Sequence, residues 1–174
     1  MVNDFKMEKD FDEEIVEGTV YRKGNNYTLR FNHYVKLGLP ETVLKKLGID
    51  PKELESFVDE TYQFADNMAD SPSFAGPGHS ACDRNSKIRE YAAYKLVKFV
   101  NERCSEQFNE TKFVKENCLE GLNTMFVYQK NGVSITNAWP FNREIRKGLL
   151  EDAGCTDIFP FGNEFIGIAP ENQN

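Results

Sequence analysis

Hydrophobic positions alternate with polar ones near the N-terminus of the chain. Residues 15–22 and 26–35 both have the two-residue period that is typical of half-buried antiparallel strands. One face of the second segment collects Tyr27, Leu29, Phe31, His33 and Val35. The intervening Lys23-Gly24-Asn25-Asn26 is a turn signal because Gly and Asn tolerate positive φ. The pattern predicts a β-hairpin.

A helical spacing of apolar residues follows. Pro40 can open a short helix over 41–47, which Gly48 can close. Asp50-Pro51-Lys52-Glu53 supplies an N-cap, a first-turn proline and a capping-box glutamate, which predicts a helix over 51–69. Three further helices are expected, over 81–104, 110–119 and 142–153.

Two more hairpins are predicted in the C-terminal third of the chain. Lys130-Asn131-Gly132 separates the extended segments 125–129 and 133–138. Gly162-Asn163 separates 157–161 from 164–169. Because strands come as neighbouring hairpins rather than alternating with helices, the order favours an α+β class with antiparallel pairing.

The length of 174 residues suits one domain, which at this size buries roughly 70% of the surface of its unfolded chain. We expect an acidic tail at 1–13, a single α+β domain over 14–170 with antiparallel hairpins packed on about five helices, and a polar tail at 171–174. The predicted core comprises Leu29, Phe31, Leu54, Phe57, Val58, Ile88, Leu96, Phe99, Val127, Ile135, Leu149 and Ile166.

The formal charge of −7 argues against non-specific binding to nucleic acid, because a field of that sign repels phosphate. The acidic N-terminus lacks the basic and apolar regions of a signal peptide, and no stretch approaches 18 apolar residues. No disulfide framework is legible in Cys82, Cys104, Cys118 and Cys155. These features together predict reduced thiols, a cytoplasmic location and no membrane partner.

The segment from Gly76 to Arg84 leads a glycine-rich loop into the longest predicted helix. Backbone N–H groups and the helix dipole at such a junction favour an anion. The candidate ligand-binding residues are Gly76, Gly78, His79, Ser80, Arg84 and Lys87. Ser80 and Asp83 also have capping-box spacing, which would satisfy the same N–H groups internally.

Catalytic and metal-binding signatures are weak throughout the sequence. His79 and Cys82 are the only candidates for an imidazole and thiol pair, since a thiol at a helix N-terminus is readily ionised. Buried cysteine is the competing interpretation. The histidines and cysteines lack metal-ligand spacing, and no metal or cofactor is expected.

Trp139 and Arg143 are candidate partner-binding residues, because a Trp beside an Arg can anchor an interface. The alternative is a hydrophobic staple, in which Phe141 precedes the cap Asn142 and packs on the following helix.

Two functions follow from these observations. The first is a non-enzymatic acidic binding protein, an adaptor or inhibitor, that docks on another protein. It rests on the net charge, on the aromatic side chains (14 Phe, 7 Tyr and 1 Trp), and on the absence of a catalytic signature in the sequence. The alternative is a protein that binds, or acts as an enzyme on, a small phosphate-containing anion at the Gly76–Arg84 junction.

Overall fold

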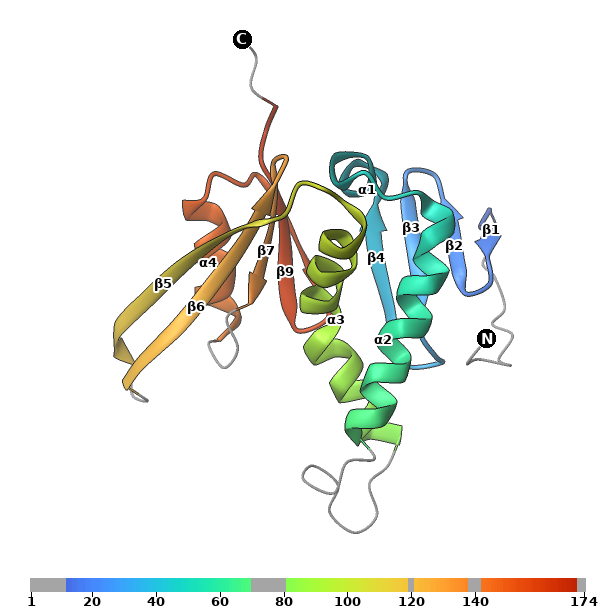
Figure 1. Cartoon of the computed structure of the whole chain (residues 1–174), viewed down its shortest axis with the longest axis horizontal. Coiled ribbons are helices and arrows are strands. Elements are labelled where there is room, and N and C mark those ends of the chain that lie inside the picture. The colour runs from blue at the N-terminus through green and yellow to red at the C-terminus, as the bar shows by residue number, and fades with distance from the viewer. Residues whose placement is uncertain (1–11, 70–80, 119–120, 138–141, 172–174) are drawn as a thin grey trace. The chain divides into compact units, whose positions relative to one another are not determined.

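The computed structural model describes residues 12–69, 81–118, 121–137 and 142–171, with the backbone alone at 81–83, 114–118 and 121–124 (Figure 1). Main-chain contacts group the chain into two compact units, Met1–Ala92 and Ala93–Asn174. Each unit has its own antiparallel sheet, which confirms the α+β class. The assignment of 14–170 to a single domain stays a prediction.

The N-terminal unit contains a four-stranded meander and helices. Its strands are β1 (Glu14–Glu17), β2 (Val20–Lys23), β3 (Asn26–Arg30) and β4 (Lys36–Pro40), paired in that order. Its helical elements are α1 (Glu41–Leu47), the 3-10 turn η1 (Pro51–Glu53), α2 (Leu54–Ala69) and the start of α3 (Ala81–Arg103). The rings of Phe31 and Phe57 meet edge to face at 6.3 Å, which packs the end of β3 against α2.

The strand predicted over 26–35 ends at Arg30, so its last third is not extended. The side chain of Asn32 accepts hydrogen bonds from the N–H groups of Tyr34 and Val35, both at 2.8 Å. This turn competes with strand pairing and returns the chain into β4. His33, expected on the buried face, is exposed as a result.

A buried ion pair holds the residue before β1 against the N-terminal sheet. Arg30 donates from Nη2 to both carboxylate oxygens of Glu13, at 2.7 and 2.8 Å. The Arg30 guanidinium also lies 3.9 Å from the centre of the Tyr21 ring. Glu13, at the end of the expected acidic tail, is therefore part of the packed structure.

The C-terminal unit contains the end of α3 and a five-stranded sheet with strand order β5-β6-β7-β9-β8. Its remaining elements are β5 (Asn109–Cys118), β6 (Gly121–Lys130), β7 (Val133–Asn137), α4 (Arg143–Asp152), β8 (Asp157–Phe161) and β9 (Glu164–Ile168). Both predicted hairpins are confirmed. Asn131 and Gly132 take φ of 50° and 81°, the left-handed conformations that a tight hairpin turn requires.

The helix predicted over 110–119 is wrong, because these residues belong to the edge strand β5. They pair with β6 from Asn109 opposite Gln129 to Cys118 opposite Gly121. The backbone N–H and C=O groups of this segment form hydrogen bonds with β6, and the local sequence contains no signal for this long-range pairing. The described residues accordingly contain four α-helices instead of five, while β5 and β6 form a ribbon twice as long as β7 (Figure 1).

All twelve predicted core residues are buried. In the C-terminal unit a cluster of buried side chains lies between α4 and the sheet, and it comprises Met125, Val127, Leu149, Leu150, Cys155 and Phe165. Gly167 in β9 is part of this tight packing, since a Cβ atom there would lie 2.7 Å from the Sγ atom of Cys155.

We expect Gly167→Ala to destabilise the protein by about 1–3 kcal/mol, the usual cost of overpacking a core. The matched control is Gly148→Ala in α4, where a Cβ would meet no atom within 4 Å. That change should be neutral or stabilise by up to about 1 kcal/mol, the helix-propensity difference. Urea unfolding of both variants measures this, and equal stabilities for the two would contradict the described packing.

In the N-terminal unit, burial raises the pKa of Glu55, and the nearby charges of Asp59 and Glu17 raise it further. The ionised carboxylate is therefore less favourable in the folded than in the unfolded state. Its destabilising effect should be present above the raised folded pKa and absent below the unfolded pKa.

We expect Glu55→Gln to unfold at higher urea concentration than the wild type at pH 7, with the difference shrinking as the pH falls through the carboxylate range. The exposed Glu53→Gln is the control. If the stability gained by Glu55→Gln instead increases as the pH falls, the pKa of Glu55 is not raised in the folded protein.

Candidate functional site

Helix α4 forms one wall of the candidate site, and its N-terminus is fixed locally. The Asn142 side chain accepts a hydrogen bond from the N–H of Ile145 at 2.9 Å, which confirms the predicted cap. Leu149 and Leu150 are buried and Ile145 packs against the same core cluster. This apolar face lies mainly on β7 and β9.

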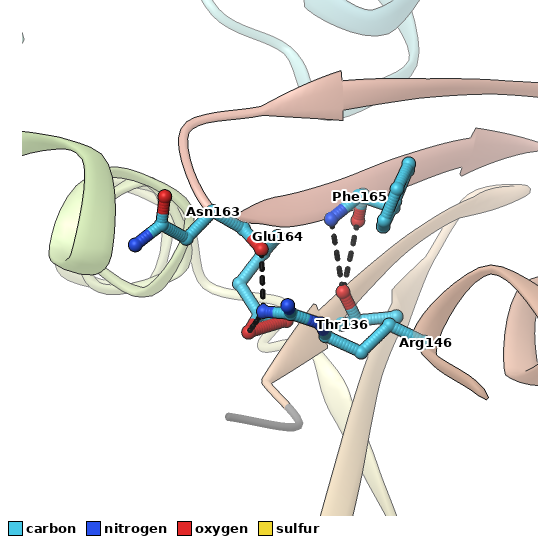
Figure 2. A network of polar contacts seen from close by, with 5 residues as sticks. All are labelled: Thr136, Arg146, Asn163, Glu164 and Phe165. Atoms are coloured by element: carbon cyan, nitrogen blue, oxygen red, sulfur yellow. Dashed lines mark hydrogen bonds and ion pairs between the residues drawn. The ribbon is translucent and has the colours of Figure 1, made fainter. Parts of the chain in front are cut away.

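A buried arginine anchors α4 to the turn between β8 and β9 (Figure 2). Arg146 donates from Nη1 to the carbonyl of Asn163 at 2.5 Å and to Oε1 of Glu164 at 3.2 Å. The two side chains are only 9% and 5% exposed. Their charges therefore compensate each other away from water, where an unpaired charge would be costly.

A hydroxyl ties β7 to β9 beside this ion pair. Thr136 accepts the N–H of Phe165 at 2.9 Å and lies 3.4 Å from the carbonyl of the same residue, to which it donates (Figure 2). The helix, the β8–β9 turn and the central strands are thereby held in one arrangement. This arrangement fixes where α4 lies above the sheet.

A groove of about 490 Å³ lies beside α4. It is lined by Phe113, Met125, Asn142, Glu144, Ile145, Gly148, Leu149 and Asp152. Phe113 of β5 and Met125 of β6 are cross-strand partners, so they lie on the same face of the sheet. The groove thus has an apolar floor on the β5–β6 ribbon and a wall formed by α4.

Three residues of α4 that line the groove are spaced by four positions: Glu144, Gly148 and Asp152. This spacing places them in one row along the helix. Gly148 stands in the middle of the helix, where glycine costs roughly 1 kcal/mol relative to alanine. A Cβ there would meet no atom within 4 Å, so no contact among the described residues requires a glycine.

The groove lining combines apolar side chains with two carboxylates and, among the described residues, no Lys or Arg. Such a surface repels phosphate and other anions. It suits an apolar group that carries a positive charge at its edge.

The residues proposed for an anion site fall only partly within the structure. Gly76, Gly78, His79, Ser80 and the partner-binding candidate Trp139 lie outside the described residues, as does the side chain of Cys82. Arg84 pairs with Asp66, and Lys87 pairs with Glu90 at 3.1 Å. Because both cations already have carboxylate partners, their availability to a ligand is reduced; the anion site stays a prediction.

Arg143 is exposed at the start of α4, with its guanidinium 5.5 Å from the centre of the Phe165 ring. Together with Arg146 it lines a separate cavity of about 80 Å³ next to the β8–β9 turn. The structure therefore places Arg143 beside the arginine anchor and not in the lining of the larger groove.

Sequence reasoning missed the groove for an identifiable reason. The row Glu144, Gly148 and Asp152 is readable from the predicted helix over 142–153. The floor is not readable, because the sequence predicts a helix over 110–119, whereas Phe113 lies in strand β5. Only the pairing of β5 with β6 brings Phe113 next to Met125.

Among the described residues, no group of three or more His, Cys, Asp or Glu side chains is placed to hold a metal ion. No helix within these residues has the length and apolar character needed to cross a membrane.

We expect Arg146→Met to destabilise the protein by about 3–5 kcal/mol, because it leaves the Glu164 carboxylate buried without its guanidinium. Adding Glu164→Leu to Arg146→Met should recover a large part of that loss, since no unpaired charge remains. Urea unfolding of the single and double variants measures the coupling. Additive losses would show that the pair is energetically independent.

Comparison with known proteins finds no matching family model, no matching curated protein and no matching solved structure. A function for the chain must therefore be inferred from its own residues. The groove beside α4 has all its lining residues within the described part of the chain, whereas most of the Gly76–Arg84 junction lies outside it.

Proposed function

We propose that this chain is a non-enzymatic acidic binding protein, an adaptor or inhibitor, that docks on another protein through the groove beside α4. The observation that carries the proposal is a groove with an apolar lining, in which Phe113 and Ile145 are only partly buried, next to a helix glycine that no contact among the described residues requires. A glycine in that position lets a partner's backbone approach the helix closely.

The groove can supply binding energy through its apolar lining. Phe113 and Ile145 are only partly buried, and they stand next to the fully packed cluster around Met125 and Leu149. A partner would cover these partly exposed side chains and bury a Leu or Phe of its own in the groove. Each side chain that becomes fully buried stabilises the complex by about 1.5–3 kcal/mol. A few such contacts around one centre are typical of interface hot spots.

The charge of the molecule supports a protein partner over an anionic small molecule. The net charge is −7, and the two charged residues of the groove lining are both acidic. Complementary charge on a partner would raise the association rate and favour correct partners over acidic ones.

The proposal is tested by filling the groove. We expect Gly148→Trp to abolish capture of a stoichiometric protein partner by the tagged 174-residue chain in lysate of the native host. The introduced ring enters open space, so the variant should fold. Lys147→Trp is the matched control, because it adds the same ring at an exposed position of the same helix that does not line the groove.

Calorimetry with the purified partner then quantifies the effect. We expect Gly148→Trp to weaken binding at least about 100-fold, equivalent to losing one or two hot-spot contacts, and Lys147→Trp to change it less than about threefold. Thermal unfolding of each variant checks that the fold is intact. A partner bound equally well by Gly148→Trp, or no stoichiometric partner at all, would refute the proposal.

A further inference from the structure

We infer that the groove accepts an amphipathic, basic helix of the partner, which lies beside α4 on the β5–β6 ribbon and crosses α4 at Gly148. This inference rests on the proposed docking function and specifies the chemistry of the occupant. Three features lead to it: the width of the sheet, the row of residues on α4, and the charge at the two ends of that row.

The sheet of the C-terminal unit is wider than one helix can cover. Neighbouring strands lie about 4.8 Å apart, and a helix with its side chains is roughly 10–12 Å across. One helix therefore covers two or three strands. Helix α4 packs mainly on β7 and β9, and the cluster beneath it also buries Met125 and Val127 of β6. The part of this face that one helix leaves open is therefore the edge strand β5, where Phe113 is only partly buried.

A second helix in the same layer would complete the covering of this face. Layers of parallel or antiparallel helices on one face of a sheet are a standard way for domains to bury apolar surface. Packed helices approach to 8–10 Å between axes, and the distance depends on the side chains at the contact. Gly148 contributes no side chain, so it is the natural point of closest approach.

The charges on either side of Gly148 specify a basic helix. Glu144 and Asp152 are both exposed, and no ion pair involves either of them among the described residues. They are eight residues apart, which is about 12 Å along the helix axis. Lys or Arg residues seven or eight positions apart on a neighbouring helix can reach both carboxylates.

Asp152 is an acidic residue at the C-terminal end of α4, where the helix dipole favours a basic residue. It is the last residue of α4, and the last turn contains no basic residue. A carboxylate there opposes the negative end of the helix dipole and is unfavourable by a few tenths of a kcal/mol or more. A bound Lys or Arg would offset this repulsion, which gives the residue a reason to be acidic.

The same charges argue against a second copy of this chain as the occupant. An antiparallel arrangement of two α4 helices about a twofold axis would bring Glu144 of one copy next to Asp152 of the other. Repulsion between these two carboxylates would weaken the contact between the copies. The occupant is therefore a different protein.

The experiment is a selection from a phage-displayed library of random 20-residue peptides on the immobilised 174-residue chain, with counter-selection on Gly148→Trp. We expect enriched peptides to have apolar residues at i, i+3 or i+4 and i+7, with Lys or Arg seven or eight positions apart. A synthetic enriched peptide should gain helical circular dichroism when it binds.

Charge variants test the pairing with the same synthetic peptide by calorimetry. We expect Asp152→Lys to weaken binding about tenfold, whereas Glu151→Lys, an equal charge change at an exposed position outside the groove lining, should change it less than about twofold. Thermal unfolding monitors the fold of both variants. Sedimentation of the protein alone reports whether copies associate.

The outcomes separate the two proposals. If no enriched peptide loses binding on Gly148→Trp, both the docking function and the helical occupant are refuted. If Gly148-dependent peptides are enriched but are acidic, bind as extended strands, or tolerate Asp152→Lys as well as Glu151→Lys, the docking function stands and the basic helix is refuted. A Gly148-dependent dimer of the protein would also refute it.

Discussion

A buried ion pair orients α4 on the apolar face of the C-terminal sheet. Arg146 reaches from the helix to the Asn163 carbonyl and the Glu164 carboxylate, and so joins the helix to the start of β9. In the interior an unpaired charge is far more costly than in water, so this pair tolerates little displacement of either element. The wall of the groove is thereby fixed relative to its floor.

Several residues around the groove are poor choices for stability alone. Gly148 weakens the middle of α4, and Asp152 opposes the dipole at its end. By contrast, Asn142 caps the helix and Gly167 makes room for Cys155, so each has a structural reason within the unit. The unexplained residues share one row facing the groove. That coincidence is the physical basis for assigning the row to binding.

The class of the fold and much of its local structure follow from short-range patterns in the amino-acid sequence. Turn chemistry at Gly24, Asn131 and Gly162 located the three predicted hairpin turns, since positive φ is a local property of these residues. It missed the turn at Gly18, which divides the strand predicted over 15–22 into β1 and β2. Periodic apolar residues identified the core, because burial of one face leaves a periodic record in the sequence. Caps such as Asn142 marked the start of α4 for the same local reason.

The location of the candidate site depends on long-range contacts that short-range patterns do not contain. The segment that becomes β5 is polar at many positions, and it is a strand because β6 offers it backbone partners in register. The early end of β3 depends likewise on the side chain of Asn32, which bonds across to Asn85 on α3 as well as to its own turn. A groove that combines residues from β5, β6 and α4 has no local signature. It exists only once long-range pairing and the Arg146 ion pair have brought those elements together.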